Sequence, residues 1–257
     1  MMKRMLVVAA TLTVLVGAAG AAMAQAPAGA KPTASSAFVW IEGETVEKTN
    51  VPVHGWLKGD NLKMLSGGDA LTGMAKPTAL PSPCFITYTF DSPADGTFDL
   101  YIRHGYMASL GAMRYRFVKL GADGQPSRKM GDEEGWLKFD QDATTLDRQQ
   151  IGQFRTIGWT KQQQVPLEKA SYQLDVQVTG PNPGRASDPA ADVWIAIDAI
   201  CLTKEPFTPS GILKPGEKPG DKPGATSAAA KPASPPAPLQ SPAAAAAAQA
   251  AANPGGK

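Results

Sequence analysis

Hydrophobic and polar residues alternate with a period of two through the middle of the chain, between Ser36 and Leu213. Such alternation is typical of β-strands that bury one face. The stretches that show it most clearly are residues 38–44, 84–90, 97–103, 113–120, 171–178 and 194–203. Turn residues such as Asp95 and Gly96 separate them, and no convincing helical stripe longer than about three turns interrupts them. The pattern predicts an all-β domain, folded as an antiparallel β-sandwich.

The N-terminal end of the chain has a different pattern. Lys3 and Arg4 precede an apolar run, which closes with the small residues Ala22 and Ala24. This order is typical of a secretory signal peptide. A membrane anchor is the alternative, but the run is barely long enough to span a bilayer and its last third holds only Gly, Ala and Met. We therefore predict a signal peptide over 1–24 and a flexible spacer over 25–35. The product is expected to be periplasmic or secreted, with no membrane span after leader cleavage.

The C-terminal end is rich in Pro, Ala, Lys and Gly. From Lys214 the sequence repeats Lys-Pro-Gly and then becomes an Ala- and Pro-rich stretch in which Leu239 is the single large apolar residue. Such a segment cannot bury enough apolar surface to offset the entropy lost on ordering. The sequence therefore predicts a disordered tail over 214–257, which leaves one folded domain over 36–213.

Charge and composition exclude several kinds of protein. The chain carries 25 Lys and Arg against 23 Asp and Glu, and its formal net charge of +2 falls to about 0 when Lys3 and Arg4 leave with the leader. This balance argues against a nucleic-acid partner held by bulk charge. Two Cys and two His rule out a disulfide-dense scaffold and a Cys/His zinc site. Cys84 and Cys201 lie in predicted strands, and whether they form a disulfide stays open.

No pattern in the chain indicates catalysis. The Gly-x-Ser-x-Gly, His-Glu-x-x-His and phosphate-loop motifs are all missing from the sequence. The three consecutive acids at 132–134 are most simply a solvated turn, and nothing singles out a pair of carboxylates for glycosidase chemistry. The sequence therefore predicts a protein that is not an enzyme.

Three motifs in order suggest a family. They are Ile-Glu-Gly-Glu at 41–44, Ala-Asp-Gly-Thr-Phe-Asp-Leu-Tyr-Ile-Arg at 94–103 and Ile-Asp-Ala-Ile-Cys-Leu-Thr at 197–203. Together they resemble the first, middle and last strands of the galactose-binding-like jelly roll, and within it the carbohydrate-binding modules of families six and thirty-five. The resemblance implies a jelly-roll sandwich that binds a polysaccharide or other glycan.

The same resemblance implies a structural calcium ion held by Glu42, Glu44 and Asp198. The residue pattern supports the idea, because Glu42 and Glu44 are two apart in a strand and share a face. Asp198 lies in an otherwise apolar strand, where an unpaired carboxylate is costly. Calcium takes oxygen ligands of this type. The alternative is that Asp198 accepts backbone hydrogen bonds while the two glutamates face water or pair with Lys or Arg.

Aromatic residues beside glycines are the candidates for glycan contact, because flat rings stack on sugars. The predicted ligand-binding residues are Trp56, Tyr106, Trp136 and Trp159, with Arg103 to hold hydroxyl groups. For each ring the alternative is that it caps the end of the sandwich. Trp40 and Trp194 lie in apolar strands and are predicted to be core.

One departure from the resemblance bears on function. The modules often carry an Asn just before the closing Ile-Asp pair, whereas Ala196 and Ile197 precede Asp198 in this chain.

Three interpretations of function follow from the sequence. The first is an exported, non-catalytic glycan-binding protein with a structural calcium ion. The second is a scaffolding sandwich that presents an interaction surface to a protein partner in the cell envelope. A polysaccharide-processing enzyme is the third.

Overall fold

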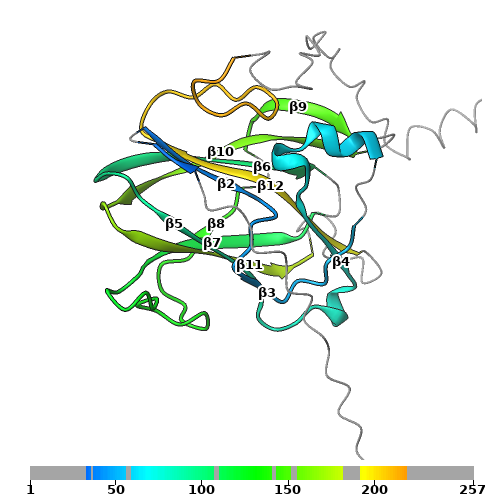
Figure 1. The fold of residues 1–257 in the computed structure, drawn as a ribbon. Coiled ribbons are helices and arrows are strands. Elements are labelled where there is room, and N and C mark those ends of the chain that lie inside the picture. The colour runs from blue at the N-terminus through cyan, green and yellow to red at the C-terminus, as the bar shows by residue number, and fades with distance from the viewer. Residues whose placement is uncertain are drawn as a thin grey trace, which may run out of the picture. The chain divides into compact units, whose positions relative to one another are not determined.

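The computed structural model describes residues 33–35, 37–55, 59–106, 110–140, 143–151, 155–181 and 192–218. The predicted signal peptide, residues 25–32 of the predicted spacer and the predicted tail beyond residue 218 lie outside these ranges. The spacer prediction is corrected at its C-terminal end, because Thr33 and Ala34 form a short strand that pairs with residues 39–40. Two antiparallel sheets face each other as two layers (Figure 1). Within the described ranges no helix is long and apolar enough to cross a membrane. The predicted all-β sandwich is confirmed.

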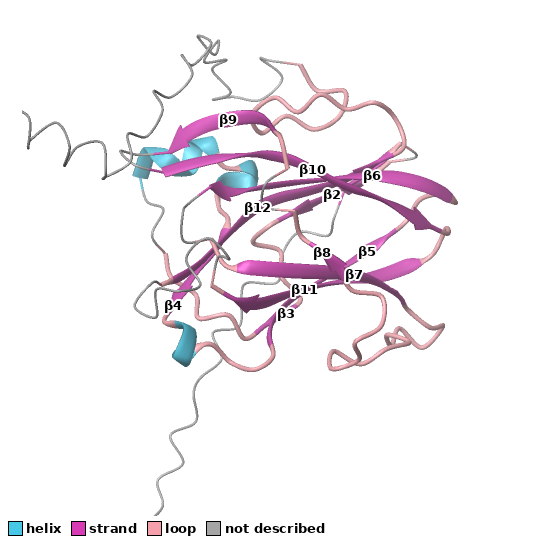
Figure 2. Cartoon of the chain, turned by 180° about the vertical axis from the view of Figure 1, so that it is seen from behind, coloured by secondary structure: helices cyan, strands magenta, loops and turns pink. Residues whose placement is uncertain are grey.

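The larger sheet has seven strands and the smaller has five (Figure 2). The order in the seven-stranded sheet is β1 (Thr33–Ala34), β2 (Phe38–Glu42), β12 (Val193–Thr203), β6 (Gly96–Tyr106), β10 (Arg155–Leu167) and β9 (Thr145–Ile151), with β4 (Leu71–Ala75) also paired to β12. The order in the five-stranded sheet is β3 (Lys48–Thr49), β5 (Cys84–Asp91), β11 (Ser171–Gly180), β7 (Ala112–Lys119) and β8 (Leu137–Lys138). Because β2 pairs with β12, Ile41 lies opposite Ile200 and the first and last long strands are neighbours.

The core fills the space between the sheets with every second residue of the long strands. Tyr88 of β5, Leu100 of β6 and Leu202 of β12 are completely buried there. The residues between them point to the outer face of their sheet, as the alternation predicts. A second, smaller cluster lies on the outer face of the seven-stranded sheet, around Trp40 of β2.

Three short pieces of chain cover the outer face of the seven-stranded sheet. Two are the 3-10 helices η1 (Gly59–Met64) and η2 (Ser66–Gly68), and the third is the segment that follows β12 (Figure 1). A further 3-10 turn, η3 (Pro77–Ala79), follows β4. These three segments keep the apolar cluster around Trp40 out of water.

The β9–β10 hairpin is not among the strands that the sequence predicts. In β9 the side chains alternate between exposed and half-buried, and Ile151 alone is buried, so the alternation is not one of hydrophobic and polar residues. Leu146 is the apolar residue of this edge strand that faces solvent, with 47% of its surface exposed. A strand at the edge of a sheet can form from such a polar sequence because its neighbour β10 supplies the hydrogen bonds.

Candidate functional site

The outer face of the seven-stranded sheet brings Glu42, Glu44 and Asp198 together. Ala199 pairs with Glu42 on one side of β12, and the β12–β6 ladder shifts register between Ile197 and Ala199. Asp198 is the extra residue of this β-bulge, which turns its carboxylate to the outer face. The acids that the sequence singled out for calcium therefore share one small region under η2.

Gly67 of η2 closes this region from above. A Cβ atom at Gly67 would lie 2.4 Å from Glu44 Oε1 and 3.6 Å from Glu42 Cδ, and the backbone φ of +66° also favours glycine. A larger side chain at this position would displace the Glu44 carboxylate. We use the name acid cluster for Glu42, Glu44 and Asp198.

Arg103 is the buried counter-ion of Asp198. Its Nη1 donates to Asp198 Oδ2 and, at 2.9 Å, to the carbonyl of Met64, while Nη2 donates to Gln149 Oε1 at 2.9 Å. Arg103 and Asp198 are both inaccessible to solvent. The prediction that Arg103 holds sugar hydroxyls is therefore corrected, because its guanidinium is enclosed by protein acceptors.

Burial and mutual repulsion perturb the acid cluster. Burial raises the pKa of Glu44 to about 7, and the neighbouring charges of Glu42, Asp198 and Asp69 push it in the same direction. Burial also raises the pKa of Asp198 to about 7, against the opposing effects of Arg103 and of the Ser66 N–H, which donates to Oδ1 at 3.0 Å. Burial therefore disfavours the charged form of both carboxyl groups at neutral pH.

A cation fits part of this arrangement. Glu42 Oε2, Glu44 Oε2 and Ser66 Oγ are buried without a hydrogen-bond partner. Both oxygens of Asp198 already accept hydrogen bonds, and Glu42 Oε1 lies 3.4 Å from Lys214 Nζ. Among the described residues no three Asp, Glu, His or Cys side chains form a ready metal site. The free oxygens of Glu42 and Glu44 suit a hard cation. Asp198 instead accepts hydrogen bonds from the protein, including one from a backbone N–H, which is the alternative given for it above.

Trp159 belongs to the protein interior and not to a loop. It lies in β10 and is completely buried, with its ring 5.3 Å from the Trp40 ring and its Nε1 donating to the carbonyl of Gly211 at 2.8 Å. The neighbouring Gly158 does not mark a turn. A Cβ there would lie 2.4 Å from the carbonyl oxygen of Asp147 in β9, so the glycine permits two strands to approach closely. The prediction of Trp159 as a glycan platform is corrected.

Trp136 lies on the outer face of the five-stranded sheet. The register of β7 with β8 pairs Arg114 with Lys138, which places Trp136 opposite Arg116. The ring centroid is 4.6 Å from the guanidinium carbon of Arg114 and 4.5 Å from that of Arg116, and Nε1 donates to the carbonyl of Asp132 at 2.8 Å. The ring is partly exposed, and these contacts hold it firmly on the sheet.

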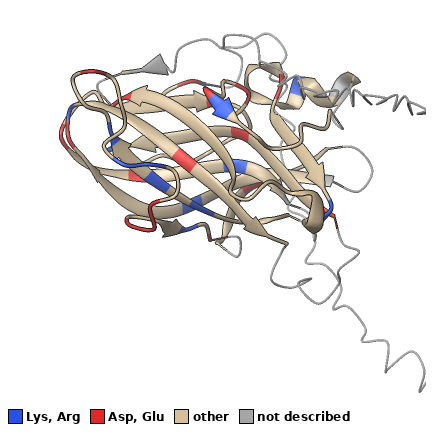
Figure 3. Ribbon diagram, turned by 90° about the horizontal axis from the view of Figure 1, so that it is seen from below, with Lys and Arg blue, Asp and Glu red and all other residues tan. Residues whose placement is uncertain are grey.

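Polar side chains surround the Trp136 ring. Arg114 donates to both carboxylate oxygens of Glu133, at 2.6 and 2.9 Å, and to Gln177 Oε1 at 2.8 Å. Figure 3 looks onto this sheet and shows basic and acidic positions interspersed along it. We call Trp136, Arg114, Glu133 and Gln177 the Trp136 platform.

A buried ion pair supports the Trp136 platform from below. Arg116 donates from Nε to Asp175 Oδ2 at 3.0 Å, and its two remaining nitrogens donate to the carbonyls of Asp132 and Lys129 at 2.8 and 2.6 Å. Arg116 and Asp175 are almost inaccessible to solvent. The pair therefore fastens the loop that carries Trp136 to the sheet. Sequence reasoning missed it, since an Arg and an Asp in alternating strands are ordinary surface residues.

Two predicted core residues, Trp40 and Trp194, have different positions. Trp40 is buried as predicted, although on the outer face of its sheet. Trp194 is only partly buried, with its ring centroid 6.4 Å from the ring of the exposed His54 in an edge-on contact. It sits on the outer face of β12, opposite Met74 of β4. Trp194 is thus a second partly exposed tryptophan.

Two of the predicted ligand-binding residues are not described by the structure. Trp56 and the side chain of Tyr106 lie outside the described residues.

One histidine and both cysteines are buried in the protein. His104 is completely buried between the sheets, edge-on to Phe139 with ring centroids 4.9 Å apart, and burial lowers its pKa to about 4. It is therefore neutral at pH 7 and out of reach of a substrate. Cys84 and Cys201 are both buried and free, the first in the core and the second in the cluster around Trp40. The sheet separates the two thiols, so they form no disulfide.

Comparisons with known proteins return similar structures only. No protein-family model matches the chain, and no curated protein matches it. A β-(1,4)-mannanase from Podospora anserina with a family 35 module is similar over 68% of this chain and 29% of its own, at 19% identity and a TM-score of 0.39. The C-terminal family 6 module of a marine laminarinase from Zobellia galactanivorans is similar over 65% of this chain and 99% of its own, at 16% identity and a TM-score of 0.38.

A family 35 carbohydrate-binding module from an environmental isolate is similar over 66% of this chain and 93% of its own, at 14% identity and a TM-score of 0.34. These likenesses, each with a TM-score below 0.5, assign no ligand to this chain. The strand order itself, with β2 beside β12 in an antiparallel sandwich, agrees with the galactose-binding-like jelly roll that the motifs resemble.

Proposed function

We propose that this chain is an exported, non-catalytic protein that binds a glycan on the Trp136 platform. The observation that carries the proposal is the partly exposed Trp136 ring, held against two guanidiniums and bordered by Glu133 and Gln177. A fixed flat ring suits the C–H face of a sugar, and charged or amide side chains beside it suit the hydroxyl groups. Export rests on the signal-peptide pattern of residues 1–24.

Replacing Trp136 by alanine should weaken glycan binding about thirtyfold or more, because a central aromatic contact contributes about 2 kcal/mol or more. Binding is measured by calorimetry with a polysaccharide selected from an array of neutral and acidic glycans. Trp136→Phe keeps a flat ring and should retain part of the affinity. The circular-dichroism spectrum and unfolding temperature of each variant report on folding.

Trp194→Ala is the matched control, since it removes another partly exposed tryptophan, on the other sheet. If Trp194→Ala abolishes binding and Trp136→Ala does not, the location of the site is wrong. If no glycan on the array binds and a specific envelope protein is captured instead, the scaffolding function replaces this proposal.

We also propose that the acid cluster binds a calcium ion, with Glu42 and Glu44 as ligands and Asp198 adding negative charge beside them. The support is chemical, because three buried oxygens without partners, those of Glu42, Glu44 and Ser66, suit a hard cation. When bound, such an ion supplies the positive charge that this region lacks and ties η2 to β2.

Calcium should raise the unfolding temperature relative to excess chelator. At one hundred times the dissociation constant the stabilisation is about 2.7 kcal/mol, which corresponds to roughly 5–10 °C for a domain of this size. The measurement is differential scanning calorimetry of the mature protein. Glu44→Gln removes one ligand charge and should abolish most of the shift. Equal unfolding temperatures with calcium and with chelator would show that the site does not bind the ion.

A further inference from the structure

The segment that follows β12 lies across the outer face of the seven-stranded sheet. We call residues 204–217 the strap; it appears as the loop above the sheet in Figure 1. Its Phe207 ring is edge-on to the rings of Tyr101 and Trp159, at centroid distances of 5.3 and 5.8 Å. The backbone of Gly211 accepts a hydrogen bond from Trp159 Nε1 and donates one to Asp147 Oδ2 at 2.5 Å. The strap thus covers the aromatic cluster.

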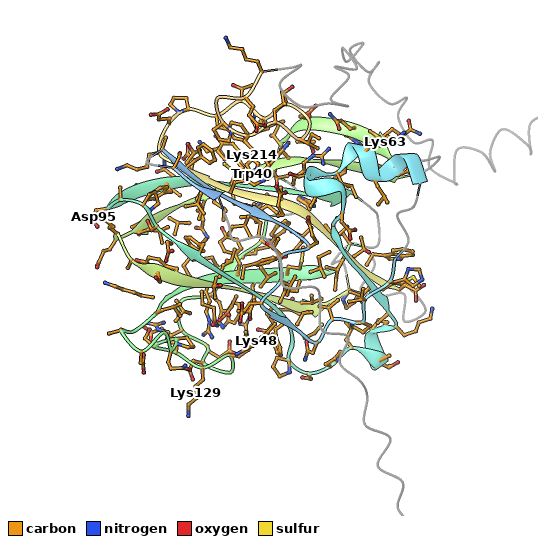
Figure 4. The ribbon with its side chains drawn as sticks, in the orientation of Figure 1. Trp40, Lys48, Lys63, Asp95, Lys129 and Lys214 are labelled. Carbon is orange, nitrogen blue, oxygen red and sulfur yellow. The ribbon has the colours of Figure 1, made fainter. Side chains whose placement is uncertain are left out.

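Lys214 joins the strap to the acid cluster. Its Nζ lies 3.4 Å from Glu42 Oε1 and 5.5 Å from the centroid of the Trp40 ring. Figure 4 shows the labelled Lys214 and Trp40 side chains together. The backbone N–H of Lys214 donates to Glu217 Oε2 at 2.8 Å, which forms the last turn of the strap. This position corrects the predicted tail boundary, because Lys214 belongs to the folded domain.

The charges around the acid cluster do not balance. Three carboxylates, those of Glu42, Glu44 and Asp198, face two cations, Arg103 and Lys214. Asp69 adds a fourth acidic group near Glu44, so the carboxyl groups of this region outnumber the two cations. Arg103 is inaccessible to solvent, whereas the Lys214 side chain is 19% exposed. A divalent cation at Glu42 would repel the Lys214 ammonium, and Lys214 is the one of these two cations that is exposed enough to move away.

We propose that Lys214 is an internal counter-ion which competes with a divalent cation for Glu42, so that cation binding loosens the strap. The inference rests on the proposed cation site and concerns its regulation. The competition is reciprocal, because the factor by which the Lys214–Glu42 contact weakens cation binding equals the factor by which a bound cation weakens that contact. The strap is the element that responds, since Lys214 is part of it.

Lys214→Met tests the competition, since it keeps the aliphatic stem over Trp40 and removes the charge. Calcium affinity, measured by calorimetry with calcium chloride, should increase about two- to fivefold, which is the range expected for a partly exposed ion pair. Lys204→Met is the matched control. Lys204 is in the same strap, but its Nζ lies 5.9 Å from the Phe98 ring centroid and contacts the carbonyl of Asp95, away from the acids. The calcium affinity of Lys204→Met should equal that of the natural protein.

Hydrogen exchange of the Trp159 indole N–H reports on the strap, because this group donates to the carbonyl of Gly211. Calcium should accelerate this exchange in the natural protein and in Lys204→Met, and should have little effect in Lys214→Met. Calcium binding of equal strength in all three proteins, with exchange unchanged, would overturn the role of Lys214 and leave the cation site intact. No calcium binding in any of them would overturn both.

Discussion

Replacing Arg103 by methionine should destabilise the folded protein by about 3–5 kcal/mol, since breaking a buried ion pair leaves an uncompensated charge. Asp198 would remain buried with Glu42 and Glu44 beside it and without its guanidinium. The carbonyl of Met64 and the side chain of Gln149 would lose their donors as well. Equilibrium unfolding in urea, monitored by tryptophan fluorescence, measures the loss.

A double variant distinguishes the charge effect from a packing effect. Arg103→Met combined with Asp198→Leu removes both members of the pair and should recover a large part of the lost stability, because an apolar pair of similar volume replaces a buried ion pair at little cost. If the single and double variants are equally unstable, the pair interaction is not the source. A loss below about 1 kcal/mol in the single variant, the range of exposed pairs, would contradict the burial of Arg103.

Replacing Trp159 by alanine should cost about 3–5 kcal/mol, the range for removing a large buried aromatic side chain. Trp159 fills the space between Trp40 and Phe207, and its indole holds the strap at Gly211. The loss is measured by the same unfolding experiment. Trp159→Phe keeps most of the ring and loses the hydrogen bond, so its cost should be distinctly smaller.

The same variant separates a core residue from a binding residue. At a temperature where Trp159→Ala remains folded, its glycan affinity should equal that of the natural protein, whereas Trp136→Ala loses affinity without a comparable loss of stability. Reduced glycan binding by a folded Trp159→Ala protein would restore Trp159 as a ligand contact and would contradict its burial under the strap.

The sequence predicts correctly those strands whose pattern lies within a single strand. The alternation in 84–90 and 97–103 corresponds to β5 and β6, whose inward residues Tyr88 and Leu100 are buried. A residue whose neighbours come from a distant segment is not predictable in this way. Gly158 resembles a loop residue but marks the close approach of β9 and β10, which no local pattern records.

The candidate cation site also has a part that the sequence predicts and a part that it does not. The sequence predicted Glu42 and Glu44 in one strand, but β2 ends at Glu42 and Glu44 lies in the turn that follows it. The two glutamates still share a region with Asp198, because the first and last long strands are neighbours, as the jelly-roll resemblance implies. The pattern did not indicate that Arg103 is the partner of Asp198, since the contact depends on a β-bulge. Counted back from Ile200, strict alternation would place Asp198 in the core.

The amino-acid order by itself indicated the sandwich and its strands of alternating hydrophobic and polar residues, because side-chain alternation is a local property, but it did not indicate the polar strand β9. The tertiary structure alone decided which faces are covered. Trp159 is buried because the strap covers it on the seven-stranded sheet. Trp136 is partly exposed because it lies on a loop that Arg116 fastens over the five-stranded sheet. Whether a ring or a charge meets water depends on contacts between segments far apart in the chain, and a one-dimensional pattern does not contain those contacts.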